Sequence, residues 1–276
     1  MKNKRIAFYG KGGIGKSTIA SNVSAILSKK GKKILHIGCD PKSDSTRVLV
    51  KKRIPTVLKT LKEKGNNLSK EDILFKGVYG VICVEAGGPE PGIGCAGMGI
   101  SAAIEVLEGL EVFEMDWDLI IYDVLGDVVC GGFSIPMRKN CVDEVYIVTS
   151  AEFMSLYAAN NILKGVENFS TAENRMFGGI IYNRWVSDKD KAVIDYFIKM
   201  IQGRLIASIR QSSTIKRAEY QKSTIFEINP QDAAALEIEN LAGHLLDSHL
   251  TYDVKSLDDE TLEHMVEFIS KQEQEI

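Results

Sequence analysis

The sequence predicts an α/β fold in which a mostly parallel sheet carries helices on both faces. Short apolar runs rich in β-branched residues alternate with longer segments of helical periodicity, and this alternation is typical of parallel sheets. A glycine-rich loop ending in Lys16-Ser17 stands between the first apolar run and the first helical segment. Such a position suits a loop that binds phosphate.

The elements are expected in regular alternation along the chain. Strands are predicted at Arg5–Tyr9, Lys33–Gly38, Val78–Val84, Leu119–Tyr122, Glu144–Thr149, Gly179–Tyr182 and Leu205–Ile209. Helices are predicted at Lys16–Lys30, Ile100–Leu107, Phe153–Phe169, Asp188–Ile201 and Gln231–Asp247. Two glycine-rich segments, Ala86–Gly99 and Gly126–Pro136, interrupt the pattern.

The composition fits one main globular domain. The chain has 276 residues, of which 45% are hydrophobic and 26% charged, so it can bury a sizeable core. Its net charge of −3 offers no general field for nucleic acid or an anionic membrane, and no apolar run is long enough to span one. We therefore expect a cytoplasmic protein with neither nucleic acid nor a membrane as partner.

The C-terminal tail differs from the rest of the chain. Residues 251–276 carry eight acidic residues and two basic ones, which leaves the main domain, residues 1–250, with a positive balance. Leu262, Met265, Val266 and Ile269 are spaced as on one face of a helix. We expect an acidic helical tail that packs one face on the body, although a solvated terminal helix is the simpler alternative.

The phosphate loop matches the pattern G-x-x-x-x-G-K-[ST] from Gly10 to Ser17. Its backbone N–H groups and the following helix N-terminus favour phosphate, Lys16 is suited to the β- and γ-phosphates, and the Ser17 hydroxyl to Mg²⁺. The predicted class is a P-loop nucleotide hydrolase with a deviant Walker A sequence, because Lys11 adds a second lysine. Two adjacent cations favour a site completed by a second chain, although Lys11 could also be a surface lysine. The expected nucleotide-binding residues are Gly12, Gly13, Ile14, Gly15, Lys16, Ser17 and Thr18.

Acidic residues follow two of the predicted strands. Asp40 and Asp44 come after Lys33–Gly38, and Asp123 ends the run at Leu119–Tyr122. Carboxylates at strand C-termini lie on the ligand edge of a parallel sheet. With Gly126, Asp123 forms D-x-x-G, which suits Mg²⁺ contact through water, and Asp127 is placed to orient the attacking water. A helix cap or a turn is the alternative role for these acids.

Two of the five cysteines lie in glycine-rich loops. Cys95 and Cys130 are flanked by glycines whose N–H groups could bond to the sulfides of an iron–sulfur cluster. A four-iron cluster takes four thiolates, so the stoichiometry closes if two chains each contribute Cys95 and Cys130. Cys39 and Cys83 are expected in the core, and Cys141 receives no role.

Together these motifs resemble the nitrogenase iron protein family. The resemblance covers about residues 4–247 and rests on Lys11–Ser17, Gly38–Lys42, Gly87–Gly92, Gly94–Gly97, Tyr122–Phe133 and Tyr157–Asn161. It implies a homodimer, bridged by one [4Fe-4S] cluster, that hydrolyses MgATP while passing single electrons to a catalytic reductase component. A low-potential ferredoxin or flavodoxin is the implied electron donor.

The resemblance also implies roles for individual residues. Lys11 would reach the nucleotide across the dimer, Asp40 and Asp44 would form switch I, and Asp123 to Asp127 switch II. Asn183 would contact adenine, and Arg210 is the adenine-side residue that carries over from a Pro-Arg-Asp run that reads Ile209-Arg210-Gln211 here.

The chain departs from the resembled family in the loop expected to dock the partner. The family usually has an arginine there, beside the cluster, and this chain has Met98. This change, the altered adenine-side run and the acidic tail resemble divergent nitrogenase-like reductases, including those that serve tetrapyrrole biosynthesis. The main hypothesis is an ATP-gated electron donor. The alternatives are an iron–sulfur carrier or regulatory ATP sensor, and a positioning ATPase of the same superfamily.

Overall fold

The computed structural model describes residues 3–88, 96–124, 126, 134–138, 141–171 and 173–274. These residues form an eight-stranded sheet in the order β3-β4-β2-β5-β1-β6-β7-β8. Every strand pairs in parallel with its neighbours except β3, which runs antiparallel to β4 at the sheet edge. The strands are β1 (Lys4–Tyr9), β2 (Ile34–Gly38), β3 (Phe75–Lys76), β4 (Ile82–Glu85), β5 (Leu119–Asp123), β6 (Glu144–Thr149), β7 (Phe177–Trp185) and β8 (Leu205–Arg210).

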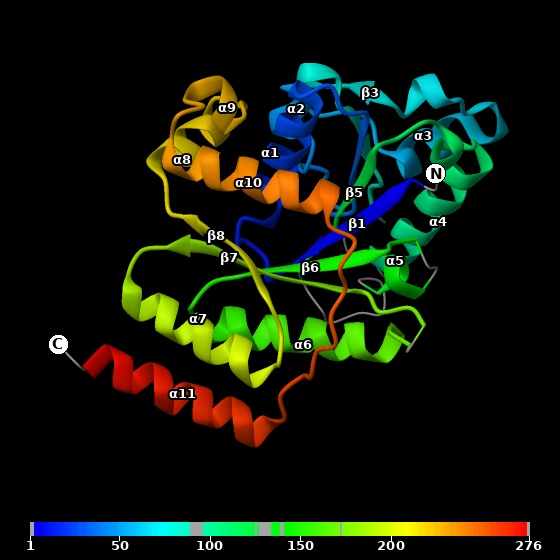
Figure 1. Cartoon of the computed structure of the whole chain (residues 1–276). Coiled ribbons are helices and arrows are strands. Elements are labelled where there is room, and N and C mark those ends of the chain that lie inside the picture. Colours follow the sequence, from blue (N-terminus) through cyan, green and yellow to red (C-terminus); the bar gives the residue numbers. More distant parts are fainter. Residues whose placement is uncertain are drawn as a thin grey trace.

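Helices cover both faces of this sheet, as Figure 1 shows. One face carries α1 (Lys16–Lys29), α2 (Arg47–Val50), α8 (Ser213–Tyr220), α9 (Ile225–Ile228) and α10 (Ala233–Asp247). The other carries α3 (Val57–Lys64), α4 (Ala96–Gly109), α5 (Ile135–Arg138), α6 (Phe153–Phe169), α7 (Asp188–Met200) and α11 (Asp259–Gln274). Two apolar cores therefore lie on opposite sides of one buried sheet, and the predicted fold class is confirmed.

The predicted strand at Val78–Val84 is wrong at its first half. Val78–Gly80 forms a 3-10 turn in which Tyr79 has φ 54°, and the strand begins only at Ile82. The apolar run continues across this turn, so hydrophobicity alone could not locate its start. The helix predicted at Ile100–Leu107 is longer and spans Ala96–Gly109.

Strand register brings three chain segments together at the C-terminal ends of β2, β4 and β5. Gly38 at the end of β2 pairs with Asp123 of β5 on one side and with Glu85 of β4 on the other. His36 lies two residues before Gly38, so its side chain is on the same face of the sheet. The segments that follow β2, β4 and β5 thus begin side by side.

The C-terminal tail packs on the body, as the spacing of its apolar residues predicts. Leu262 and Met265 of α11 are buried against the core beside α6 and α7, and Phe268 stacks on Tyr196 at 4.3 Å between ring centroids. The division into residues 1–250 and 251–276 stays a prediction. Among the described residues, no helix combines the length and apolarity that a membrane span requires.

Candidate nucleotide-binding site

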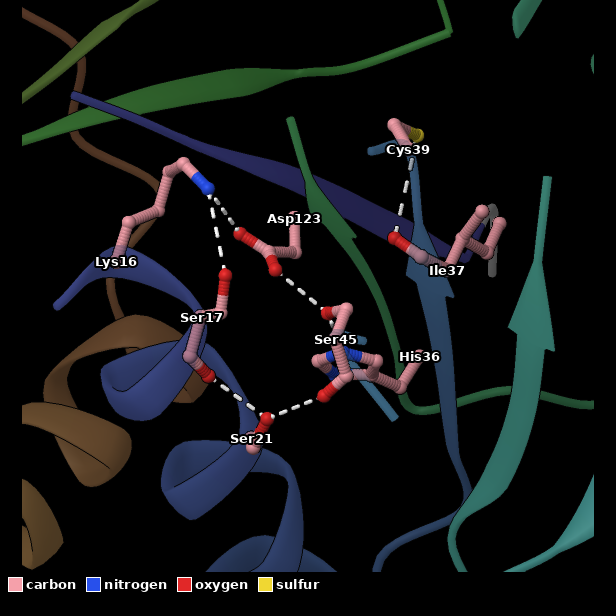
Figure 2. Close-up of polar contacts among 8 residues, drawn as sticks. All are labelled: Lys16, Ser17, Ser21, His36, Ile37, Cys39, Ser45 and Asp123. Atoms are coloured by element: carbon pink, nitrogen blue, oxygen red, sulfur yellow. Dashed lines mark hydrogen bonds and ion pairs between the residues drawn. The ribbon is translucent and has the colours of Figure 1, made fainter. Parts of the chain in front are cut away.

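The phosphate loop joins β1 to α1 and places Lys16 at the first position of that helix. The Lys16 ammonium lies 2.7 Å from Asp123 Oδ1 and 3.5 Å from Ser17 Oγ. Figure 2 shows this pair, with Ser45 donating to the second Asp123 oxygen at 2.5 Å. Residues 107 positions apart in the chain are thus joined by a buried ion pair at the end of β5.

Asp123 is fully buried and nevertheless ionised. Burial alone would raise the pKa of its carboxyl, but attraction by Lys16 and hydrogen bonds from Lys16, Ser17 and Ser45 outweigh it, so the pKa is lowered. Lys16 thus compensates the buried charge of Asp123 beside the phosphate loop.

Two adjoining cavities open beside the loop. The smaller, about 500 Å³, is lined by the phosphate loop together with Asp40, Asp44 and Gly126. The larger, about 1170 Å³, is lined by residues at and beyond the C-terminal ends of β7 and β8, including Asn183 and Arg210. Gly15 and Thr18 line both cavities. A nucleotide could therefore place its phosphates in the smaller cavity and its nucleoside in the larger.

The expected phosphate-side residues meet in the smaller cavity. Lys11, Gly12, Gly13, Gly15, Lys16, Ser17 and Thr18 line it with Asp40 and Asp44. The Ile14 side chain is instead buried in the core, and its carbonyl accepts a hydrogen bond from the Asn183 amide at 2.7 Å. The reach of Lys11 across a dimer stays a prediction.

Hydrogen bonds within the protein hold the two residues that are expected on the adenine side. Asn183 is buried against the phosphate loop at the C-terminal end of β7. Arg210 bonds through its side chain and its backbone N–H to Glu237 of α10 and lies over the Trp185 ring at 5.3 Å. Both line the larger cavity, and their contact with adenine stays a prediction.

Two glycines that follow β4 and β5 in the chain touch the loops around the phosphate cavity. Gly126 lies so close to the phosphate loop that a Cβ there would come within 2.2 Å of the Gly10 carbonyl oxygen. Gly88 lies against Pro41, where a Cβ would come within 2.6 Å of the proline ring. Neither position has room for a side chain, so the starts of the two segments that lead toward Cys130 and Cys95 contact the loops around the phosphate cavity.

The predicted cluster ligands Cys95 and Cys130 lie outside the described residues, as does Asp127. The other three cysteines, Cys39, Cys83 and Cys141, are buried in the core. Burial is the main cause that raises the pKa of the Cys39 and Cys83 thiols well above the ordinary value, which disfavours the thiolate that a metal needs. The expected core role of Cys39 and Cys83 is confirmed, and Cys39 lies just beyond β2 rather than inside it.

Sequence reasoning missed several polar residues around Asp123. Ser45, His36 and Glu85 all gather at the edge formed by β2, β4 and β5. Arg184 was missed too, and its guanidinium donates to the Gly13 carbonyl at 2.6 Å. A signal existed for His36, because a lone polar residue stands there within an otherwise apolar strand.

Comparison with known sequences gives a consistent result. The family model described as "4Fe-4S iron sulfur cluster binding proteins, NifH/frxC family" matches residues 4–272. A nitrogenase iron protein from Methanococcus voltae is 43% identical over 271 residues, covering 97% of both chains. One from Methanospirillum hungatei is 47% identical over 267 residues, covering 95% of this chain and 94% of the relative.

Solved structures of other proteins share the fold of this chain. The septum site-determining protein MinD from Pyrococcus horikoshii, complexed with Mg-ADP, superposes with a TM-score of 0.69 over 88% of this chain and 96% of its own. Its sequence is 19% identical, so the likeness concerns the fold alone.

Proposed function

Because the chain belongs to the NifH/frxC family of 4Fe-4S cluster binding proteins, we propose that it couples MgATP hydrolysis to single-electron transfer toward a catalytic reductase component. Its cofactors are a [4Fe-4S] cluster and MgATP. Proteins of this family are homodimers that pass electrons to a catalytic component. A low-potential ferredoxin or flavodoxin is the proposed donor.

The phosphate cavity supplies the nucleotide chemistry. Lys16 would exchange Asp123 for the β- and γ-phosphates, and the Ser17 hydroxyl would be a ligand of Mg²⁺. Asp123, ionised and no longer paired with Lys16, would face the metal through water. Asp40, Asp44 and Asp127 would align the switch segments and the attacking water.

The observation that supports the proposal is the contact of Gly126 and Gly88 with the loops around the phosphate cavity. Gly126 rests on the phosphate loop and Gly88 on Pro41, and these glycines begin the segments that reach Cys130 and Cys95. Thiolates are the ligands that iron–sulfur clusters use, so these two cysteines from each of two chains would hold the cluster, which supplies one-electron transfer. If nucleotide binding moves the loops around the phosphate cavity, the segments that lead to the two cysteines would therefore move with them.

The cluster assignment is tested by iron content. Anaerobically purified protein should be a dimer with about four irons per two chains, because two thiolates per chain cannot complete a four-iron cluster. Cys95→Ser and Cys130→Ser should each abolish the cluster absorbance, whereas Cys141→Ala should retain it. Full iron content in both serine variants would contradict the assignment.

Coupling is tested by the rate of iron chelation. Chelation should differ among nucleotide-free, MgADP-bound and MgATP-bound protein. Lys16→Gln should abolish hydrolysis and this difference, and Asp127→Asn should bind nucleotide but lose the difference. Gly88→Ala should retain hydrolysis and weaken the response, because its side chain must displace Pro41. Equal chelation rates in all three nucleotide states of the wild type would exclude coupling.

The acceptor is expected to differ from that of an arginine-bearing relative. Met98 is 65% exposed in the first turn of α4, so an apolar, flexible side chain stands where a cation could pair with a partner carboxylate. We expect little substrate reduction with a molybdenum–iron nitrogenase partner, and Met98→Arg should leave the cluster and ATPase intact. Stopped-flow oxidation by candidate partners, with and without MgATP, measures this. Acetylene reduction at rates comparable to the partner's own reductase would contradict it.

A further inference from the structure

A buried histidine lies behind the phosphate site, in the middle of β2. His36 is fully buried, and both of its ring nitrogens have hydroxyl partners. Nδ1 lies 2.8 Å from Ser24 Oγ of α1, and Nε2 lies 2.8 Å from Ser45 Oγ in the segment after Asp44. Figure 2 shows the ring of His36 beside Ser45, which in turn reaches Asp123.

The direction of each hydrogen bond follows from counting protons, beginning at Asp123. An ionised carboxylate can only accept, so Ser45 must donate its single hydroxyl proton to Asp123 Oδ2. Ser45 Oγ can then only accept from the ring of His36. The His36 Nε2 atom must therefore carry a proton and donate it to Ser45.

The other ring nitrogen of His36, Nδ1, carries no proton. Burial, the largest cause, and Lys16 lower the pKa of His36 to about 4 despite the opposing effect of Asp123. The ring is thus neutral near pH 7, so Nδ1 carries no proton and accepts from the Ser24 hydroxyl. The carbonyl of Ala20, 2.9 Å from Ser24 Oγ, is the alternative acceptor for that hydroxyl.

We propose that His36 is a positioning residue which, through Ser45, keeps the Asp123 carboxylate oriented when Lys16 leaves it for the phosphates. The inference rests on the proposed function, because it requires that a nucleotide draw Lys16 away. Asp123 then retains Ser45 as a donor on Oδ2, and the donation from His36 prevents the Ser45 hydroxyl from turning elsewhere. Ser45 is fixed as well through its backbone carbonyl, which accepts from Ser21 of α1 at 2.8 Å.

A simple filling role makes different predictions. An apolar residue would pack at this point of the strand without requiring any particular hydroxyl orientation. The ring instead joins Ser24 of α1 to Ser45, and Ser45 in turn bonds to Asp123 at the end of β5. Its signature is the tautomer, because packing alone does not select Nε2–H over Nδ1–H.

The tautomer is measured on nucleotide-free protein labelled with ¹⁵N-histidine. Among the four histidines of the chain, His36 is identified by the signal that His36→Gln removes. We expect the Nε2–H tautomer with no titration between about pH 5.5 and 8. An Nδ1–H tautomer would overturn the inference.

Matched substitutions test the function of the ring. His36→Gln can place an amide N–H near the position of Nε2, whereas His36→Asn reaches only the position of Nδ1. We expect His36→Asn to lower kcat for MgATP hydrolysis about tenfold and His36→Gln to remain within about twofold of wild type. Equal losses in both variants would overturn the inference.

A double-variant cycle separates positioning from folding. In a Ser45→Ala background the path from His36 to Asp123 is already broken, so adding His36→Asn should change kcat by less than about twofold. Persistence of the tenfold loss in that background would overturn the inference. Wild-type protein without MgATP hydrolysis would overturn the proposed function together with it, whereas a fully active His36→Asn variant would overturn the role of His36 alone.

Discussion

Two carboxylates end the strands that flank β2, and they differ in charge state. Asp123 of β5 and Glu85 of β4 both pair in register with Gly38 of β2, and both are fully buried. Asp123 has a cation on one oxygen and a hydroxyl on the other. Glu85 receives the backbone N–H and hydroxyl of Thr46 on Oε1, at 2.7 and 2.8 Å, and its Oε2 has no hydrogen-bond partner among the described residues.

The two pKa values diverge for this reason. Burial raises the pKa of Glu85 to about 7, because the bonds from Thr46 only partly offset desolvation and Asp123 and Asp44 add repulsion. Burial acts on Asp123 as well, but Lys16 reverses its effect. Equal burial therefore gives an ionised carboxylate at the phosphate site and one that is close to half-protonated at neutral pH beside it.

The difference matters for residues 40–44, the proposed switch segment. Asp123 keeps a charge that can act toward a metal ion, while Glu85 holds Thr46, the N-cap residue of α2, two residues after that segment. Asp123 is the carboxylate proposed to act at the phosphate site, and Glu85 anchors Thr46. Substitutions that remove the cation, the second carboxylate or its hydroxyl donor test this division.

The largest effect is expected from Lys16→Gln in nucleotide-free protein. Asp123 would remain buried with only hydroxyl donors, so the free energy of unfolding at pH 7 should fall by about 3–5 kcal/mol. Denaturant titration measures this. Adding Asp123→Asn to Lys16→Gln should recover most of the lost stability, because no buried charge is then left unpaired.

The matched control is Lys30→Gln at the other end of α1. Its ion pair with Glu239 is half exposed, and its loss should cost less than about 1 kcal/mol. A loss for Lys16→Gln as small as that of the control would show that Asp123 does not depend on its cation.

Glu85→Gln is expected to have an effect that depends on pH. Between the ordinary pKa of 4.5 and the folded value of about 7, the folded protein holds a proton that the unfolded chain releases, so Glu85 lowers stability as pH rises. At pH 5 the free energy of unfolding of the variant should be close to that of wild type. At pH 8 the variant should be more stable than wild type by about 2–3 kcal/mol.

The comparison with wild type at each pH is essential here. His36 works in the opposite sense, because its pKa falls from 6.5 to about 4 and it adds stability as pH rises through that range. The two slopes offset each other in wild type, but His36 cancels in the difference between variant and wild type. A difference that stayed constant from pH 5 to 8 would contradict the raised pKa of Glu85.

Local sequence predicted the Asp123 side of this comparison. The apolar run at Leu119–Tyr122 ending in an acid, together with the Gly-Lys-Ser loop, indicated a strand, a carboxylate and a phosphate loop at one edge. Asp40 and Asp44 line one cavity with that loop, and their role there stays a prediction. These features depend on the order of strands only through the general rule that ligands bind at strand C-termini.

The Glu85 side could not be predicted in the same way. Its environment depends on β4 and β5 flanking β2, and on a register that aligns Glu85, Gly38 and Asp123. The turn at Val78–Gly80 also shifted the predicted strand, so Glu85 fell beyond its expected end. Short helices such as α2 and α9, with four residues each, are too brief for hydrophobic periodicity to reveal them.

The smallest effect is expected from Thr46→Val, which removes one donor to Glu85 and keeps the backbone N–H bond. The cost should be about 1 kcal/mol at pH 8 and less at pH 5, because a hydroxyl bonds more strongly to an ionised carboxylate than to a neutral one. Thr60→Val is the control, since the Thr60 hydroxyl donates to the Thr56 carbonyl at 2.8 Å and its loss should cost the same at both pH values. Thermal or denaturant unfolding at the two pH values measures both variants. A pH-independent cost for Thr46→Val would mean that Glu85 does not change its charge in this range, which would contradict its raised pKa.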